Sequence, residues 1–196
     1  MAFVNKDKNI VEFGLSNVKY AVLAYTAETK TYTIGDIKDI PGAVDLSMPA
    51  SGDSAEFYAD DTLYWSEYSN TGYEGTISFA RIPDEFSIDV LGFEQDANGA
   101  IFEKSNAVVN EIAMWFQFAG DKNHTKHCFL RCSVSRPDIA GKTTEKTKSP
   151  NTSQLKIKAM PRLGDYRVRA KQPDDGSEAY INFDTKLPEP AAASGV

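Results

Sequence analysis

Alternation of apolar and polar side chains with a period of two is the feature that most constrains this fold. It recurs in five runs, at residues 18–26, 111–120, 126–135, 154–159 and 166–171. Successive side chains of a β-strand point to opposite faces of its sheet, so each run predicts a strand. In the second run the even-numbered side chains are expected to be the buried ones. The second and third runs are separated by a short turn and should pair as an antiparallel hairpin.

The remaining local signals add shorter strands and a single helix. Residues 29–35 indicate a hairpin, and residues 43–48 and 76–82 indicate strands. Pro83, followed by two acidic residues, predicts the start of a helix that ends at Gly92. Strand signals therefore outnumber helix signals. The expected class is mainly β, an antiparallel β-sandwich with one short flanking α-helix and a long loop between strands.

Length and composition favour one domain. A chain of 196 residues buries one sizeable core, and its middle contains no stretch that looks like a linker. We expect a β-sandwich domain over residues 1–172, with a flexible lead at about residues 1–12, and a flexible C-terminal extension over residues 173–196. Residues 141–149 lack an apolar anchor and are expected to form a mobile loop. No run is apolar enough to span a bilayer, and residues 1–22 lack a secretory signal, which predicts folding in a cytosol.

Reactive side chains form no recognisable catalytic or metal-binding motif. Four side chains of metal-ligating type lie close in the sequence, namely His124, His127, Cys128 and Cys132. On one strand the two cysteines would lie about 13 Å apart, which excludes a disulfide and disperses the four ligands. The adjacent carboxylates Asp60 and Asp61 would point to opposite faces of a strand. We therefore expect no catalytic residue, no cofactor, no metal and no enzymatic activity.

An aromatic and acidic loop is expected at residues 60–73. Its distinctive side chains are Asp60, Asp61, Tyr64, Trp65, Glu67, Tyr68 and Tyr73. Exposed aromatic clusters usually mark a surface that another molecule covers, so one interpretation is a contact arm. The other interpretation is that the rings fold back onto the sheets of their own chain.

Charge is distributed unevenly along the chain. The net charge of −7 argues against a nucleic-acid-binding surface. Residues 45–103 contain thirteen acidic residues and one basic residue, whereas residues 122–171 contain thirteen basic and three acidic residues. The last two predicted strands should present a shared basic face, made of Lys156, Lys158, Arg167, Arg169 and Lys171. Either the two halves neutralise each other internally, or the acidic surface of one copy meets the basic surface of the next, head to tail.

Seven short stretches, taken together, resemble a known family in their order and spacing. They are residues 14–20 (GLSNVKY), 40–44 (IPGAV), 57–61 (FYADD), 72–75 (GYEG), 82–86 (IPDEF), 118–122 (FAGDK) and 131–137 (RCSVSRP). In this order the chain resembles the major tail tube proteins of long-tailed bacteriophages with non-contractile tails. The resemblance covers residues 10–171 and leaves the C-terminal extension outside it.

The resemblance implies a structural role in a virion. It implies a β-sandwich with a flanking helix, hexameric rings, and rings stacked into a tube that is assembled in the cytoplasm of the bacterial host. Residues 60–73 would correspond to the loop that reaches the neighbouring ring. The lumen would be negative, and viral DNA would pass through it without specific binding. Partners implied for such a tube are further copies of the chain and the tail tip or baseplate, tape-measure and tail terminator proteins.

Two other functions are compatible with parts of the sequence. A carbohydrate- or receptor-binding β-sandwich of a virion or cell surface would use Tyr64, Trp65, Tyr68 and Tyr73 as a platform for a sugar. An enzyme would need a pocket that contains carboxylates of perturbed pKa, and the sequence offers no convincing one.

Overall fold

The computed structural model describes residues 12–139, 141 and 151–191, and this part of the chain is mainly β. Its strand pairs are antiparallel throughout. Two short α-helices and one 3-10 helix complete the described structure. The predicted mainly β class and antiparallel pairing are therefore confirmed, whereas the single predicted helix is one of two α-helices in the described residues. The predicted lead and the loop at residues 141–149 lie, except for Glu12 and Gly141, outside the described residues.

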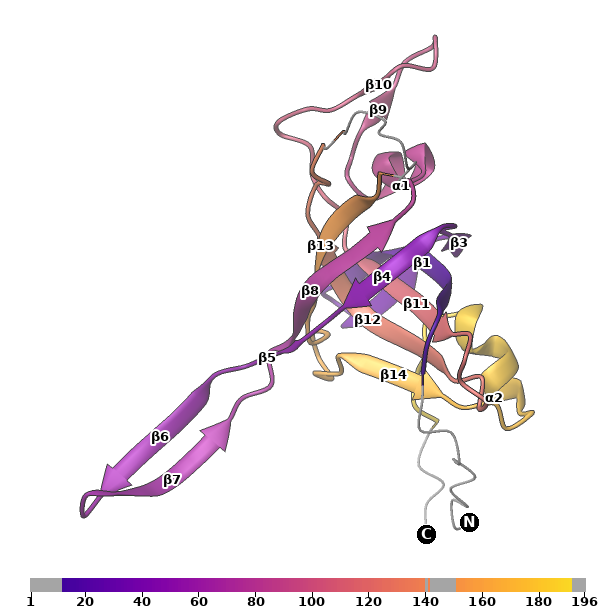
Figure 1. Cartoon of the computed structure of the whole chain (residues 1–196). Helices are drawn as coiled ribbons and strands as arrows, with labels where there is room; N and C mark the ends of the chain where they lie inside the picture. The colour runs from indigo at the N-terminus through magenta and orange to yellow at the C-terminus, as the bar shows by residue number, and fades with distance from the viewer. Residues whose placement is uncertain (1–11, 140, 142–150, 192–196) are drawn as a thin grey trace, which may run out of the picture.

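Ten strands form one sheet (Figure 1). Its order is β2 (Thr31–Ile34), β1 (Leu15–Thr26), β11 (Ile112–Phe118), β12 (Lys126–Val134), β13 (Ser153–Ala159), β8 (Gly72–Phe79) and β4 (Ala43–Ser47). Three strands attach beside this path, namely β3 (Lys38–Asp39) on β1, β5 (Ala50–Ser51) on β8 and β14 (Arg169–Gln172) on β12. The sheet curls so far that β4 contacts β1. Bulges in three of its pairings support this curl, because an extra residue increases the local twist.

The long period-two runs form strands close to where they were predicted. β11 and β12 pair as the expected hairpin, with Trp115 opposite Cys128. The prediction that β11 is buried only on its even face is wrong, because Ala113 and Trp115 are buried as well. The last predicted strand starts late, at Arg169, since Tyr166 adopts a left-handed backbone with φ 58°.

The concave face of the curled sheet holds the main hydrophobic core. Its buried members include Val18, Tyr20, Ile77, Phe79, Ile112, Met114, Phe129, Leu155 and Ile157. Helix α1 (Asp84–Asp89) adds Phe86 to one end of this core, and the turn that follows it adds Val90 and Leu91. The helix follows Pro83 as the sequence predicted, but it ends at Asp89, three residues before Gly92, where the chain turns away with a positive φ of 72°.

A second core lies on the opposite face of the sheet. There the C-terminal segment packs against side chains of the sheet that include Trp115 and Leu130. This segment contains α2 (Glu178–Ile181) and the 3-10 helix η1 (Asn182–Asp184), and it buries Phe183 and Leu187. The Nε1 atom of Trp115 donates a hydrogen bond of 2.9 Å to the carbonyl of Phe183. The expected flexible extension from residue 173 is therefore wrong for this stretch. The odd face of β11 is apolar and needs a cover, which the C-terminal segment supplies.

Candidate interaction surface

A β-hairpin projects from the body of the molecule (Figure 1). It consists of β6 (Ser54–Ala59) and β7 (Thr62–Tyr68), which pair only with each other. We call residues 54–68 the arm. Asp60 and Asp61 form its two-residue turn, with φ angles of 50° and 57°. Such turns need a positive φ at both positions, which Asp tolerates better than most residues. The predicted loop is therefore wrong in its local structure, because its first half is an ordered hairpin.

At the base of the arm, hydrogen bonds join the residue before β6 to the residue after β7. The backbone N–H of Ser69 donates to the carbonyl of Asp53 at 2.9 Å, and the N–H of Asp53 donates to Ser69 Oγ at 2.9 Å. Gly52 is required nearby, since a Cβ atom there would lie 1.9 Å from the carbonyl oxygen of Ser69. The two strands therefore leave the body side by side.

A β-bulge in the hairpin determines which aromatic rings of the arm share a face. Phe57 lies opposite Trp65, whereas Tyr58 lies opposite Leu63, so Tyr64 is the extra residue. The ring of Tyr64 lies edge-on to that of Phe57, with centroids 6.4 Å apart, which places both on the face that carries Trp65. One face of the arm thus carries three aromatic rings.

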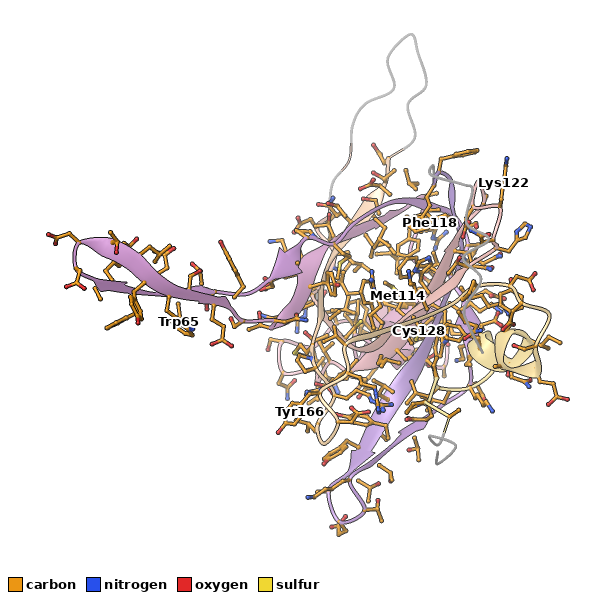
Figure 2. All side chains as sticks on the ribbon, turned by 90° about the horizontal axis from the view of Figure 1, so that it is seen from below. Trp65, Met114, Phe118, Lys122, Cys128 and Tyr166 are labelled. Carbon is orange, nitrogen blue, oxygen red and sulfur yellow. The ribbon has the colours of Figure 1, made fainter. Side chains whose placement is uncertain are left out.

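These rings do not fold back onto the sheet. Trp65 is 47% exposed, Tyr64 is 75% exposed and Tyr68 is 81% exposed. Figure 2 shows Trp65 on the arm, well away from Met114 and Cys128 in the body. Of the two interpretations of the aromatic cluster, the one that buries the rings against their own sheet is wrong for the arm.

The structure brings six of the seven predicted arm residues together. Asp60 and Asp61 are at the tip, and Tyr64, Trp65, Glu67 and Tyr68 lie along β7. Tyr73 is separate, because it belongs to β8, is half-buried, and contacts Phe129 at a ring distance of 5.5 Å. Sequence reasoning missed Phe57 and Tyr58 on the partner strand. The sequence could have indicated them, because residues that favour β-strands also occur just before the turn.

The predicted basic residues lie on two faces of the sheet instead of one. Lys156 and Lys158 alternate with core residues of β13 and point away from the main core, where Lys158 pairs with Glu74 at 3.0 Å. Arg169 and Lys171 lie opposite Phe129 and His127, on the side of the main core. The expectation of a single shared face is wrong because β13 and β14 pair with different parts of β12 on either side of a bulge.

Arg167, the fifth predicted basic residue, is bound within its own loop. Its Nη1 atom lies 2.6 Å from the carboxylate of Asp165. Some acidic and basic residues of the two halves also pair within the chain, such as Glu103 with Arg136 at 2.8 Å. Among the described residues the four acids of the arm, Glu56, Asp60, Asp61 and Glu67, form none of the ion pairs. Internal neutralisation therefore does not extend to the arm.

The cysteines and the surface grooves offer little for chemistry. Burial raises the pKa of the Cys128 thiol and that of Cys132, which disfavours the nucleophilic thiolate. Within the described ranges no three His, Cys, Asp or Glu side chains gather to hold a metal ion.

One surface groove is lined in part by Tyr32 and Asp165. Burial by itself would raise the pKa of Asp165, but hydrogen bonds from Arg162 and Arg167 lower it to about 2, so this carboxylate serves as their partner.

Comparisons with known proteins leave this surface as the main guide to function. No protein-family model matches the chain, and no curated protein matches it. Among the described residues, no helix has the length and apolar character needed to cross a membrane.

Proposed function

We propose that this chain is the tail tube subunit of a long-tailed bacteriophage with a non-contractile tail. Its copies form hexameric rings, and the rings stack head to tail into the conduit for DNA ejection in the virion. The resemblance of residues 10–171 to tail tube proteins supports this proposal, as does a mainly β fold with a short helix beside the core. In this proposal the curled sheet is a β-sandwich of the tail-tube type.

The arm is the observation that carries the proposal. A two-stranded hairpin is at best marginally stable alone in water, and this one exposes aromatic rings and unpaired strand edges. Contact with another molecule would bury the rings and stabilise the hairpin. Since the arm extends away from its own sheet, a neighbouring ring is the partner that a stacked tube would supply.

An acidic bore would suit the same role. Phosphate contacts with Lys and Arg increase the affinity of a protein for DNA, so a negative lining would let the genome pass without binding. We expect carboxylates to outnumber basic residues along the bore. A map of the assembled tube with a bore lined mainly by Lys and Arg would contradict this part of the proposal.

Electron microscopy of the purified protein at rising concentration tests the proposal. We expect tubes or six-fold rings from the wild-type chain and none from the double variant Tyr64→Ser/Trp65→Ser, because that change removes two exposed rings of the arm. The matched control is Phe102→Ser, which removes a ring that is 54% exposed on β10 (Ile101–Phe102) and should leave assembly intact. Wild-type protein that stays dispersed under all conditions would contradict the proposed function.

Carbohydrate binding is the second candidate. The predicted four-residue platform does not form, because Tyr73 lies in the sheet and not on the arm. Phe57, Tyr64 and Trp65 nevertheless share one exposed face, which favours a flat apolar ligand. Glycan binding by a stable monomer would support this candidate over the tube.

A further inference from the structure

Two basic side chains lie side by side on the outer strand β14. Arg169 is directly opposite Phe129 of β12, and Lys171 is directly opposite His127. The guanidinium of Arg169 lies over the ring of Tyr73, 5.5 Å from its centroid. We call Arg169 and Lys171 the cationic cluster, and His127 is its buried neighbour, because burial and these two charges lower the pKa of its imidazole and favour the neutral form. Both members of the cluster are exposed and form none of the ion pairs within the described part of the chain.

The imidazole beside the cationic cluster has one buried ring nitrogen that makes no hydrogen bond within the described structure. His127 is only 8% exposed, and within the described structure its buried Nε2 atom makes no hydrogen bond. The ring stacks on Phe116 at 5.2 Å and meets Phe118 edge-on at 5.5 Å. An unsatisfied buried polar group is costly, and in native proteins it calls for an explanation. The two exposed cations beside it, which form none of the ion pairs in the described part of the chain, indicate a surface that receives an anion.

The arm carries the complementary charge. Residues 54–68 contain four acids and no base, and two of these acids occupy the tip. At about 3.3 Å per residue, a strand such as β6 carries the tip roughly 20 Å from its base. Figure 1 shows the arm leaving the body at β5 and extending away from β14, the strand that carries Arg169 and Lys171. The arm of one molecule therefore cannot serve its own cationic cluster.

We propose that the tip carboxylates of Asp60 and Asp61 bind between Arg169 and Lys171 of another copy of this chain. This inference rests on the proposed tube and names the surface that receives each arm. The two contacting surfaces differ, because one is the tip of the arm and the other is the exposed face of β14. A contact of that kind is heterologous and propagates from copy to copy. In this arrangement the aromatic face of the arm contacts the sheet domain of the neighbouring copy, and its rings become buried.

A charge-swap experiment tests the docking. One variant, Asp60→Lys/Asp61→Lys, has a basic tip, and another, Arg169→Glu/Lys171→Glu, has an acidic cluster. Lys is compatible with the turn, since Lys30 has a φ of 54° in this chain. Each variant alone should need at least about tenfold more protein to assemble, because every contact then joins like charges. An equimolar mixture should assemble again, because each arm then finds a cluster of opposite charge on the other variant.

Matched controls separate docking from folding and from the proposed function. Lys156→Glu changes an exposed charge on the opposite face and should assemble like the wild type. Thermal unfolding followed by circular dichroism checks that each variant is folded. If Arg169→Glu/Lys171→Glu is not, Lys171→Glu alone replaces it in the same mixtures, with a smaller expected loss.

The outcomes of the charge swap are distinct. If the wild type forms tubes and the folded variants assemble equally well, or if the mixture fails to recover, the docking inference is overturned and the tube stands. If the wild type never associates, both ideas fail together.

Discussion

Arg162 carries a charge that is almost completely buried and connects two distant parts of the chain. It is 4% exposed, and its guanidinium pairs with Asp165 in the same loop and with Glu189 at 2.5 Å in the C-terminal segment. Hydrogen bonds that Arg162 donates to the carboxylate of Glu189 raise the pKa of this arginine further, so it stays charged at every accessible pH. A buried charge of this kind is stable only while its carboxylates are present and ionised.

Arg162→Met should therefore destabilise the protein and reduce its response to acid. We expect a loss of about 2 kcal/mol, below the range for a fully buried pair because both carboxylates are partly exposed. Asp165 has a folded-state pKa of about 2, below its unfolded value. Its stabilisation is thus complete above about pH 4 and is lost as the pH falls towards 2. Urea unfolding at a series of pH values measures both effects.

Arg167→Met is the control for this prediction. Arg167 also pairs with Asp165, but its side chain is 47% exposed, so its removal should cost less than about 1 kcal/mol. Equal losses for the two variants would show that burial of Arg162 is not the source of its effect.

The C-terminal segment is an element whose role is to cover one face of the sheet. Lys126 Nζ lies 2.5 Å from the carboxylate of Asp184, and Lys19 Nζ lies 2.8 Å from it. Burial would raise the pKa of Asp184, but the hydrogen bonds from these two lysines outweigh it and lower the pKa. The ion pairs and the buried ring of Phe183 together hold the segment against Trp115.

Phe183→Ala should cost about 3 kcal/mol of unfolding free energy, because it leaves a cavity beside Trp115. Ile181→Ala is the matched control, since Ile181 is 61% exposed on the same segment and its loss should stay within about 0.5 kcal/mol. Trp115 fluorescence during urea unfolding reports on both variants. A stability of Phe183→Ala equal to that of the control would mean that the segment does not contribute to the core.

At the scale of the whole molecule, charge is separated between the arm and the cationic cluster. A contact between exposed charges weakens when salt screens it, and the screening length falls from about 10 Å at 0.1 M to about 3 Å at 1 M ionic strength. Apolar burial is not screened in this way. The salt dependence of assembly thus separates the contribution of the tip carboxylates from that of the rings.

We expect the protein concentration needed for assembly to rise several-fold between about 0.1 M and 1 M NaCl. Sedimentation of the polymer at each salt concentration measures this. The variant Asp60→Asn/Asp61→Asn should need more protein at low salt and show a much weaker dependence, because Asn keeps the turn geometry without the charge. A wild-type protein whose assembly does not respond to salt would contradict an electrostatic contact at the tip.

The sequence by itself determined the long strands of the sheet, helix α1 and the mainly β class. Period-two alternation and the residues Pro83 and Gly92 act through their immediate neighbours, so they could be interpreted without knowledge of the fold. It also identified the stretch that became the arm, because a cluster of aromatic and acidic residues is visible in the sequence, although their exposure is not.

Only the tertiary structure decided which surfaces these residues share. It joined Phe57 to Trp65 across a hairpin, placed Tyr73 in the sheet, and separated Lys158 from Arg169 onto two faces. It also packed Trp115 against the C-terminal segment, at Phe183, which is 68 residues away in the sequence. The alternation of apolar and polar residues specifies the two sides of a strand. Which strands pair, where β-bulges form and which segment packs over a sheet depend on contacts between distant segments. A local pattern carries no information about those contacts.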